Sequence, residues 1–266
     1  MLVVDPLARG LPDPRRSDRS YLLCCTPRTG SWLLSEALSR STVAGRPDEV
    51  FSHEKEIELA GAPLRPASDS VRRWLARIDA DGRTENGVLG LKAHLEQLEH
   101  LVVRLLLLPE IPPGSPAEVI RAVYPGLQLV WNRRRDKVSQ AVSWYRSLYS
   151  GVWFKRAGDP APLTPVEPFD LRWVGSLHRR LLAQEAMWLD VFASFEAQPF
   201  VVDYEDLEAD YPAMVNGVLD FLGLALPSGV ALPPPRLEKQ ADALSEEIIA
   251  QYRAQADRQL SRIVGR

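Results

Sequence analysis

Apolar residues along the chain change repeatedly between short runs and helical spacing. Short apolar runs bounded by turn residues predict four strands, at residues 21–25, 87–94, 127–132 and 199–207. Apolar positions that recur every three or four residues predict helices beginning at Ser31, Leu95 and about Asp136, and covering 179–195, 214–224 and the C-terminal segment. Strands separated by helices predict an α/β fold, with a central, mostly parallel sheet flanked by helices on both faces.

The length of 266 residues fits one large domain. Residues 1–20 show neither pattern and are expected to form a flexible N-terminal tail, with a single domain over 21–266. Proline-rich stretches interrupt this domain twice, and lid-like loops are expected around 159–168 and 227–240.

Composition narrows the function classes. The net charge is −3 and 45% of the residues are hydrophobic, which argues against nucleic acid as a partner and against a disordered chain. No apolar stretch reaches the roughly 20 residues of a membrane span, and no signal peptide precedes the first strand, so a cytoplasmic location is expected.

The turn after the first strand has the form of an oxyanion site. A strand runs into a helix through Thr26-Pro-Arg-Thr-Gly-Ser31, and such a turn directs backbone N–H groups and the helix dipole at one point. Arg28, Thr29 and Ser31 can add hydrogen bonds. The alternative is an ordinary turn in which Ser31 caps the helix. No lysine follows Gly30, so the turn is not the phosphate loop of an ATPase or GTPase.

A second positive cluster, Arg133 to Arg135, stands at the carboxyl end of the third strand, where ligands of parallel sheets bind. Ser139 follows early in the next helix. A solvated run of surface charge is the alternative. Arginine is also common throughout the chain, since only five of its 32 positive residues are lysines. The four histidines and two cysteines show no zinc-binding spacing, so no metal is expected.

Four segments in order resemble a known family. The segments TPRTGSWLL, AGRPDEVF, RRRDKVSQAVSWYR and LEKQADALSEEIIAQYR resemble those of sulfotransferases that use 3′-phosphoadenosine 5′-phosphosulfate (PAPS), in the bacterial trehalose 2-sulfotransferase-like branch. This resemblance implies a P-loop-like sulfotransferase fold, PAPS as co-substrate and a homodimer. Trp32 stands where the family commonly has a small hydroxyl residue.

The resemblance also implies site residues. Those expected to hold the 5′-phosphosulfate are Arg28, Thr29, Gly30, Ser31 and Trp32. Arg134 and Ser139 are expected at the 3′-phosphate, and Lys239 and Gln240 on a segment that covers the nucleotide. Glu49 is implied as the general base.

Several catalytic alternatives remain open at this stage. Asp48 and His53 are rival bases to Glu49. Arg28 fits the group that stabilises the leaving phosphate, and Lys92 is a second candidate for catalysis, on the same strand face as His94. Most of the aromatic residues between Trp144 and Phe154 are expected in the core, with a minority forming an acceptor pocket.

The function expected from the sequence is therefore sulfuryl transfer from PAPS to a hydroxyl of a small carbohydrate, glycolipid or secondary metabolite. One rival is an ATP-dependent kinase or phosphotransferase. The other is a non-catalytic nucleotide-binding protein of the same fold, for which Trp32 is the single hint.

Overall fold

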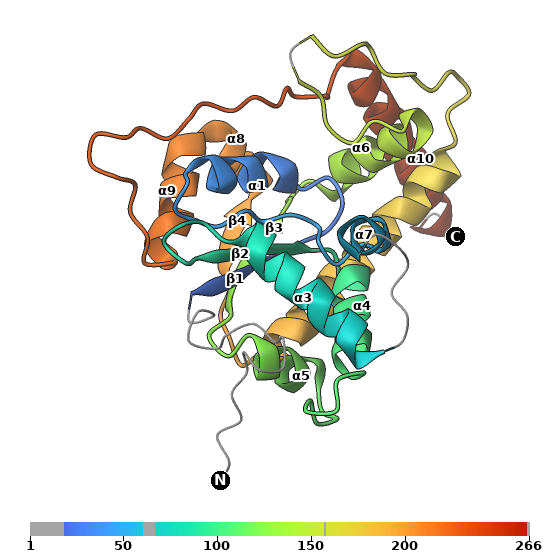
Figure 1. The fold of residues 1–266 in the computed structure, drawn as a ribbon. Helices are drawn as coiled ribbons and strands as arrows, with labels where there is room; N and C mark the ends of the chain where they lie inside the picture. The colour runs from blue at the N-terminus through green and yellow to red at the C-terminus, as the bar shows by residue number, and fades with distance from the viewer. Residues whose placement is uncertain (1–18, 61–66, 157, 265–266) are drawn as a thin grey trace.

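A four-stranded parallel sheet forms the centre of the protein (Figure 1). The computed structural model describes residues 19–60, 67–156 and 158–264, so nearly all of the tail expected over 1–20 lies outside the described residues. The strands are β1 (Ser20–Cys25), β2 (Leu89–Ala93), β3 (Gln128–Arg133) and β4 (Phe200–Asp203). Their order across the sheet is β2-β1-β3-β4, and every neighbouring pair is parallel.

The register of the strands brings their carboxyl ends to one edge. Cys24 of β1 pairs with Ala93 of β2, Cys25 pairs with Asn132 of β3, and Arg133 pairs with Asp203 of β4. The residues that follow each strand therefore emerge side by side at this edge, which is where open parallel sheets bind ligands.

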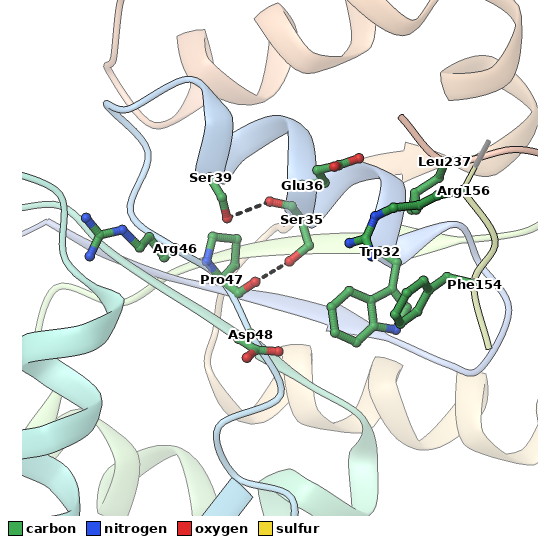
Figure 2. Close-up of a pocket in the computed structure, with 10 residues that line it drawn as sticks. All are labelled: Trp32, Ser35, Glu36, Ser39, Arg46, Pro47, Asp48, Phe154, Arg156 and Leu237. Carbon is green, nitrogen blue, oxygen red and sulfur yellow. Dashed lines mark hydrogen bonds between the residues drawn. The ribbon is translucent and has the colours of Figure 1, made fainter. Parts of the chain in front are cut away.

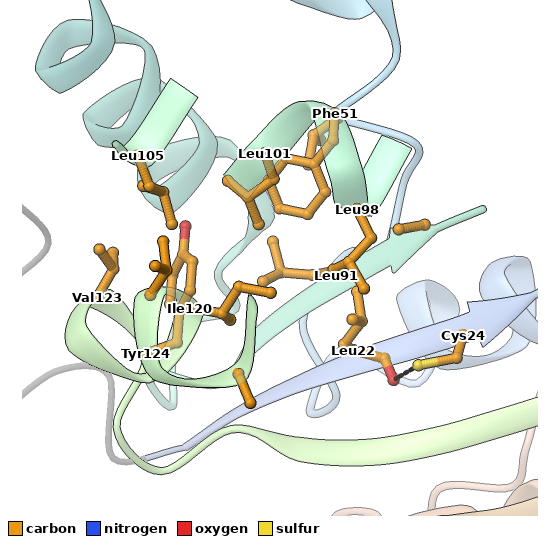
Figure 3. Close-up of a cluster of buried hydrophobic side chains, with 14 of the residues drawn as sticks. Leu22, Cys24, Phe51, Leu91, Leu98, Leu101, Leu105, Ile120, Val123 and Tyr124 are labelled. Atoms are coloured by element: carbon orange, nitrogen blue, oxygen red, sulfur yellow. Dashed lines mark hydrogen bonds between the residues drawn. The ribbon is translucent and has the colours of Figure 1, made fainter. Parts of the chain in front are cut away.

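Alternating side chains of the strands pack on opposite faces of the sheet. On one face Leu22, Cys24 and Leu91 belong to a core cluster (Figure 3). The helices that cover this face are α3 (Ser68–Gly82), α4 (Leu95–Leu105), α5 (Pro116–Val123) and α7 (Leu171–Ser194). On the other face Tyr21 and Leu23 pack with residues of α1 (Ser31–Arg40), α8 (Tyr204–Ala209) and α9 (Tyr211–Phe221).

Two further helices pack against α7 at one side of the molecule. These are α6 (Lys137–Ser150) and α10 (Ala243–Val264), whose buried residues form a third apolar cluster with α7 (Figure 1). The remaining helix, α2 (His53–Ala60), follows the loop that carries Glu49. Among the helices of the described ranges, none is long and apolar enough to cross a membrane.

The expected α/β fold with a parallel sheet and helices on both faces is confirmed. The fourth strand, expected over 199–207, was wrong in its second half, because the strand ends at Asp203 and α8 begins at Tyr204. Glu205 and Asp206 lie in the first turn of α8, where the helix dipole favours acidic residues. No element was expected at α2, α3 or α5. The start of α5 is nevertheless marked in the sequence, since Ser115 and Glu118 form a capping box around Pro116.

The aromatic residues of α6 and the loop after it divide between core and surface. Trp144 and Tyr145 are buried in the third cluster, as expected. Tyr149 is 44% exposed, although its spacing predicted the apolar face of the helix. Phe154 lies in the loop after α6 and packs against Trp32, with 5.3 Å between the ring centroids. The loops around 159–168 and 227–240 contain no helix or strand in the described residues, and their role as lids stays a prediction.

Candidate active site

The turn between β1 and α1 leaves the first turn of the helix open. Gly30 occupies the N-cap position at φ 75°, and none of the described side chains caps the helix there. A Cβ atom on Gly30 would lie 2.6 Å from the ring of Tyr204, so both the backbone conformation and the space require glycine. Ser31 is the first residue of α1 and not its cap. The N–H groups at the start of α1 are thus placed to receive an anion.

Gln140 of α6 holds this turn in place from inside. Its fully buried side-chain amide donates to the Thr26 hydroxyl at 2.9 Å and to the Pro27 carbonyl at 2.7 Å. Thr29 is also buried, and its hydroxyl donates to the Thr26 carbonyl at 3.1 Å. The expected phosphate-binding hydroxyl of Thr29 therefore already has a partner within the turn.

Arg28 projects from the turn towards α6. Its Nε donates to the Ser143 hydroxyl at 2.9 Å, and its Nη1 donates to the carbonyl of Trp153. Burial and the positive charge of Arg134 lower the pKa of Arg28 to about 10. Arg28 and Arg134 are consequently two cations that repel each other across the open turn, and an anion between them relieves this repulsion.

The three consecutive arginines have three different environments. Arg133 forms an ion pair with Asp203 at 2.7 Å, and Arg135 forms one with Asp206 at 2.7 Å. Arg134 has no carboxylate partner in the described part of the chain, its guanidinium lies 4.6 Å from the ring centroid of Tyr204, and its Nε is buried without a hydrogen-bond partner. Of the three arginines expected to bind an oxyanion, Arg134 is therefore the one left for this role. Its two neighbours link β3 to β4 and α8.

Ser139 lies at the start of α6 and is held by the helix cap. Its N–H and hydroxyl donate to the two carboxylate oxygens of Asp136 at 3.0 and 2.7 Å. Asp136 also forms an ion pair with Arg253 of α10 at 3.1 Å. The Ser139 proton is thus committed to Asp136, and the hydroxyl oxygen remains as an acceptor.

The segment before α10 is tied to the same region. Arg146 of α6 donates to the Gln240 carbonyl at 3.3 Å and forms an ion pair with Asp242. Lys239 is 57% exposed and pairs with Glu208; this hydrogen bond raises the pKa of Lys239, and the charge of Arg134 opposes the rise. Both expected residues of this segment therefore lie near the Arg134 side of the site.

A second part of the site surrounds Glu49. Its Oε1 lies 2.9 Å from Nζ of Lys92 and 3.4 Å from Nε2 of His94, and its Oε2 accepts from the Gln97 amide at 3.1 Å. Burial raises the pKa of Glu49, but His94 and Lys92 outweigh burial and hold the pKa well below its usual range. Glu49 is therefore a carboxylate at every physiological pH.

Lys92 is fully buried and lies between Glu49 and Trp32. The ring centroid of Trp32 is 4.0 Å from Nζ of Lys92. No acceptor among the described residues makes an aligned hydrogen bond with this ammonium, so its contact with Glu49 is an ion pair. Lys92 is therefore not an edge lysine with a solvated amine, because its side chain has no exposed surface.

His94 is the residue of this cluster that was not assigned a role from the sequence. Its Nδ1 lies 3.2 Å from the Cys25 carbonyl. Burial lowers the pKa of His94, but contacts with Cys25 and Glu49 outweigh it and raise the pKa to about 10. The signal for this contact was its position two residues after Lys92, on the same face of the strand.

The rival bases have other partners. Asp48 accepts the N–H of Glu49 at 2.8 Å and lies 3.4 Å from Nζ of Lys55. His53 is exposed at the start of α2, with its ring centroid 6.5 Å from that of His100. Neither has the buried cationic partners that surround Glu49.

A cleft of about 290 Å³ opens along α1 beside this cluster (Figure 2). Trp32 and Phe154 form its aromatic end, and Asp48 lies on its other side. Trp32 thus contacts both the cleft and Lys92. The site combines an uncapped helix start with two arginines, a buried carboxylate with its cations, and an adjoining cleft. This arrangement suits transfer of an anionic group to a neutral acceptor.

Comparison with known proteins supports the same chemistry. The family model described as "Stf0 sulphotransferase" matches residues 20–255. A trehalose 2-sulfotransferase of Mycobacterium tuberculosis (strain ATCC 35801 / TMC 107 / Erdman) is 30% identical over 91% of this chain and 97% of its own length. A trehalose 2-sulfotransferase of Mycolicibacterium smegmatis (strain ATCC 700084 / mc(2)155) is 31% identical over 90% and 96%, respectively. The chain belongs to the Stf0 sulphotransferase family.

Proposed function

We propose that this protein transfers the sulfuryl group of PAPS to a hydroxyl of a small carbohydrate. The observation that carries the proposal is the unpaired Arg134 facing Arg28 at the carboxyl edge of the sheet. Family membership supports sulfuryl transfer, and the names of the two relatives support a sugar as acceptor. PAPS supplies the migrating sulfuryl group.

The donor-binding residues follow from the two anionic ends of PAPS. The N–H groups from Gly30 to Trp32 would hold the 5′-phosphosulfate, because the start of α1 has no capping side chain. The guanidinium of Arg28, from the same turn, would add a positive charge. Arg134 would bind the 3′-phosphate, with the Ser139 hydroxyl near it. Lys239 and Gln240 would cover the nucleotide from the segment that Arg146 anchors.

Glu49 would accept the proton of the acceptor hydroxyl. With Lys92 and His94 on Oε1, its pKa is too low for an effective base. Lys92 is the group that can change this, since its ammonium would be drawn towards the sulfuryl oxygens of a bound donor. When the Lys92 ammonium moves away from Glu49, the pKa of Glu49 rises. Donor binding would therefore place a positive charge beside the migrating sulfuryl group and make Glu49 a stronger base.

Two further expectations stay predictions. The homodimer rests on the resemblance alone, and the cytoplasmic location rests on the hydropathy pattern of the sequence.

The donor proposal is tested by thermal shift with adenosine 3′,5′-bisphosphate, the nucleotide product. Saturation at 100 times the Kd stabilises a protein by about 2.7 kcal/mol, so the melting temperature should rise clearly. Arg134→Ala should abolish most of this rise. Arg135→Ala removes the same charge from a neighbouring residue that is already paired, so it should keep the rise. An unresponsive wild-type protein, or equal responses of the two variants, would contradict the proposal.

A further inference from the structure

Lys137, the first residue of α6, is connected to both segments that are proposed to bind the donor. Its ammonium donates to the backbone carbonyl of Arg134, and to Oε1 of Gln140 at 3.2 Å. Its third acceptor is a carboxylate oxygen of Glu185 in α7. A lysine ammonium has three N–H donors, so these three partners use all of them. No N–H of this ammonium is left for a ligand, and the side chain is only 13% exposed.

The first connection runs through Gln140 to the turn before α1. The Nε2 group of this buried amide donates to the Thr26 hydroxyl and to the Pro27 carbonyl. A carbonyl can only accept and an ammonium can only donate, so Pro27 and Lys137 together fix which way the amide points. Without Lys137, Oε1 of Gln140 would lose its donor while buried, which is unfavourable. The ammonium therefore keeps Gln140 in the orientation that holds the turn.

The second connection is to the backbone of Arg134, which lies between the end of β3 and the start of α6. The peptide group that joins Arg134 to Arg135 is held at both of its polar atoms. Its carbonyl accepts from Lys137, and its N–H donates to the carboxylate of Glu205 at 3.0 Å. The guanidinium of Arg134 is thus carried by a peptide whose orientation is fixed, although the side chain itself has no carboxylate partner among the described residues.

Glu185 holds the ammonium of Lys137 from a different helix. α7 packs against α6 in the third apolar cluster and carries none of the proposed donor-binding residues. Because Glu185 is negative, its charge alone would weaken the binding of an anionic nucleotide. If Glu185 instead acts by holding Lys137, it strengthens the binding. The two roles therefore have effects of opposite sign on nucleotide affinity.

We propose that Lys137 is a positioning residue that aligns the 5′-phosphate and 3′-phosphate segments together, and that Glu185 holds it in place. The inference rests on the proposed use of PAPS, and it gives a role in donor binding to two residues that do not touch the nucleotide. Segments that are already aligned lose less conformational freedom when the nucleotide binds, so its affinity is higher. Release of the ammonium loosens both segments at once, and the two phosphate sites are coupled in this way.

The test is calorimetric binding of adenosine 3′,5′-bisphosphate to the wild-type protein, Glu185→Leu and Glu185→Gln. Leucine removes the acceptor and releases the ammonium, so the Kd should rise about tenfold, as for the loss of one hydrogen bond. Glutamine keeps an oxygen that accepts from Lys137, so its Kd should stay within about threefold of the wild-type value. Asp190→Asn removes an exposed carboxylate from the same helix and should leave the Kd unchanged.

The two phosphate sites are measured separately with adenosine 5′-phosphate and adenosine 3′-phosphate. Glu185→Leu should weaken the binding of both, whereas Arg134→Ala should weaken that of the 3′-phosphate alone. An unchanged or lower Kd in Glu185→Leu, no rescue by glutamine, or an effect of Glu185→Leu on one mononucleotide alone would overturn the inference and leave the proposed function standing. If the wild-type protein binds none of the three nucleotides, the proposed function fails and the inference fails with it.

Discussion

Replacement of Glu49 by glutamine should destabilise the folded protein, in addition to any effect on the reaction. Lys92 has no exposed surface, and Glu49 is the carboxylate 2.9 Å from its ammonium. Glu49→Gln therefore leaves a buried cation without a counter-charge, with the positive His94 on the same side. Breaking a buried pair in this way costs about 3–5 kcal/mol. The face of Trp32 is present before and after the change and does not offset this cost.

Removing the cation instead should cost less. In Lys92→Met the carboxylate of Glu49 keeps His94 at 3.4 Å and Gln97 at 3.1 Å, and its side chain is 21% exposed. The loss is then close to one charged hydrogen bond, about 1.5–3 kcal/mol. The double variant, Glu49→Gln with Lys92→Met, buries neither charge. Its loss in free energy of unfolding should therefore be smaller than the sum of the losses of the two single variants, by about 2 kcal/mol or more.

Urea unfolding of the wild-type protein, the two single variants and the double variant measures this coupling. Glu85→Gln, which removes an exposed carboxylate, should stay within about 0.5 kcal/mol of the wild-type free energy of unfolding. Costs of Glu49→Gln and Lys92→Met that add to within about 0.5 kcal/mol would refute the buried pair.

Three other predictions concern the same site. On folded protein at low temperature, Glu49→Gln should lower kcat by about 10²–10⁴-fold, as for loss of a general base, while the Kd of adenosine 3′,5′-bisphosphate in calorimetry stays near the wild-type value. The raised pKa of His94 stabilises the fold fully below its unfolded value of about 6.5, and this contribution is lost as the pH rises through about 10. Urea unfolding from pH 6 to pH 10 should show this decline, and His94→Gln should flatten it; equal slopes would be evidence against the assigned contacts. Gly30→Ala should reduce the free energy of unfolding by at least about 1–2 kcal/mol, because φ is 75° and the new methyl group meets Tyr204; a neutral result in urea unfolding would contradict the geometry of the turn.

The sequence was sufficient for those parts of the fold in which a local pattern determines the structure. β1, the turn and α1 were predicted from an apolar run, a glycine and helical spacing, and all three are local properties. The second half of the strand expected at 199–207 failed because the apolar run ends before Asp203 and the acidic residues after it favour a helix start. α2 is short and mostly polar, so its pattern did not distinguish it from a loop.

In the site, too, local features were predictable from the sequence, whereas contacts between distant segments were not. The sequence located the arginine run, but only the fold distinguishes Arg134 from its neighbours, because Asp203 and Asp206 reach them from β4 and α8. Likewise, the sequence placed Lys92 and His94 on one strand face. Their contact with Glu49 depends on how the loop before α2 lies against β2, which no local pattern records.

The most direct test of the central claim is an assay of the purified protein with PAPS and trehalose, analysed by mass spectrometry. We expect a sulfated sugar and an equal amount of adenosine 3′,5′-bisphosphate, without added metal, and loss of both products in Glu49→Gln. A phosphorylated sugar formed with ATP and Mg²⁺, or nucleotide binding without turnover across a broad panel of neutral sugars, would contradict it.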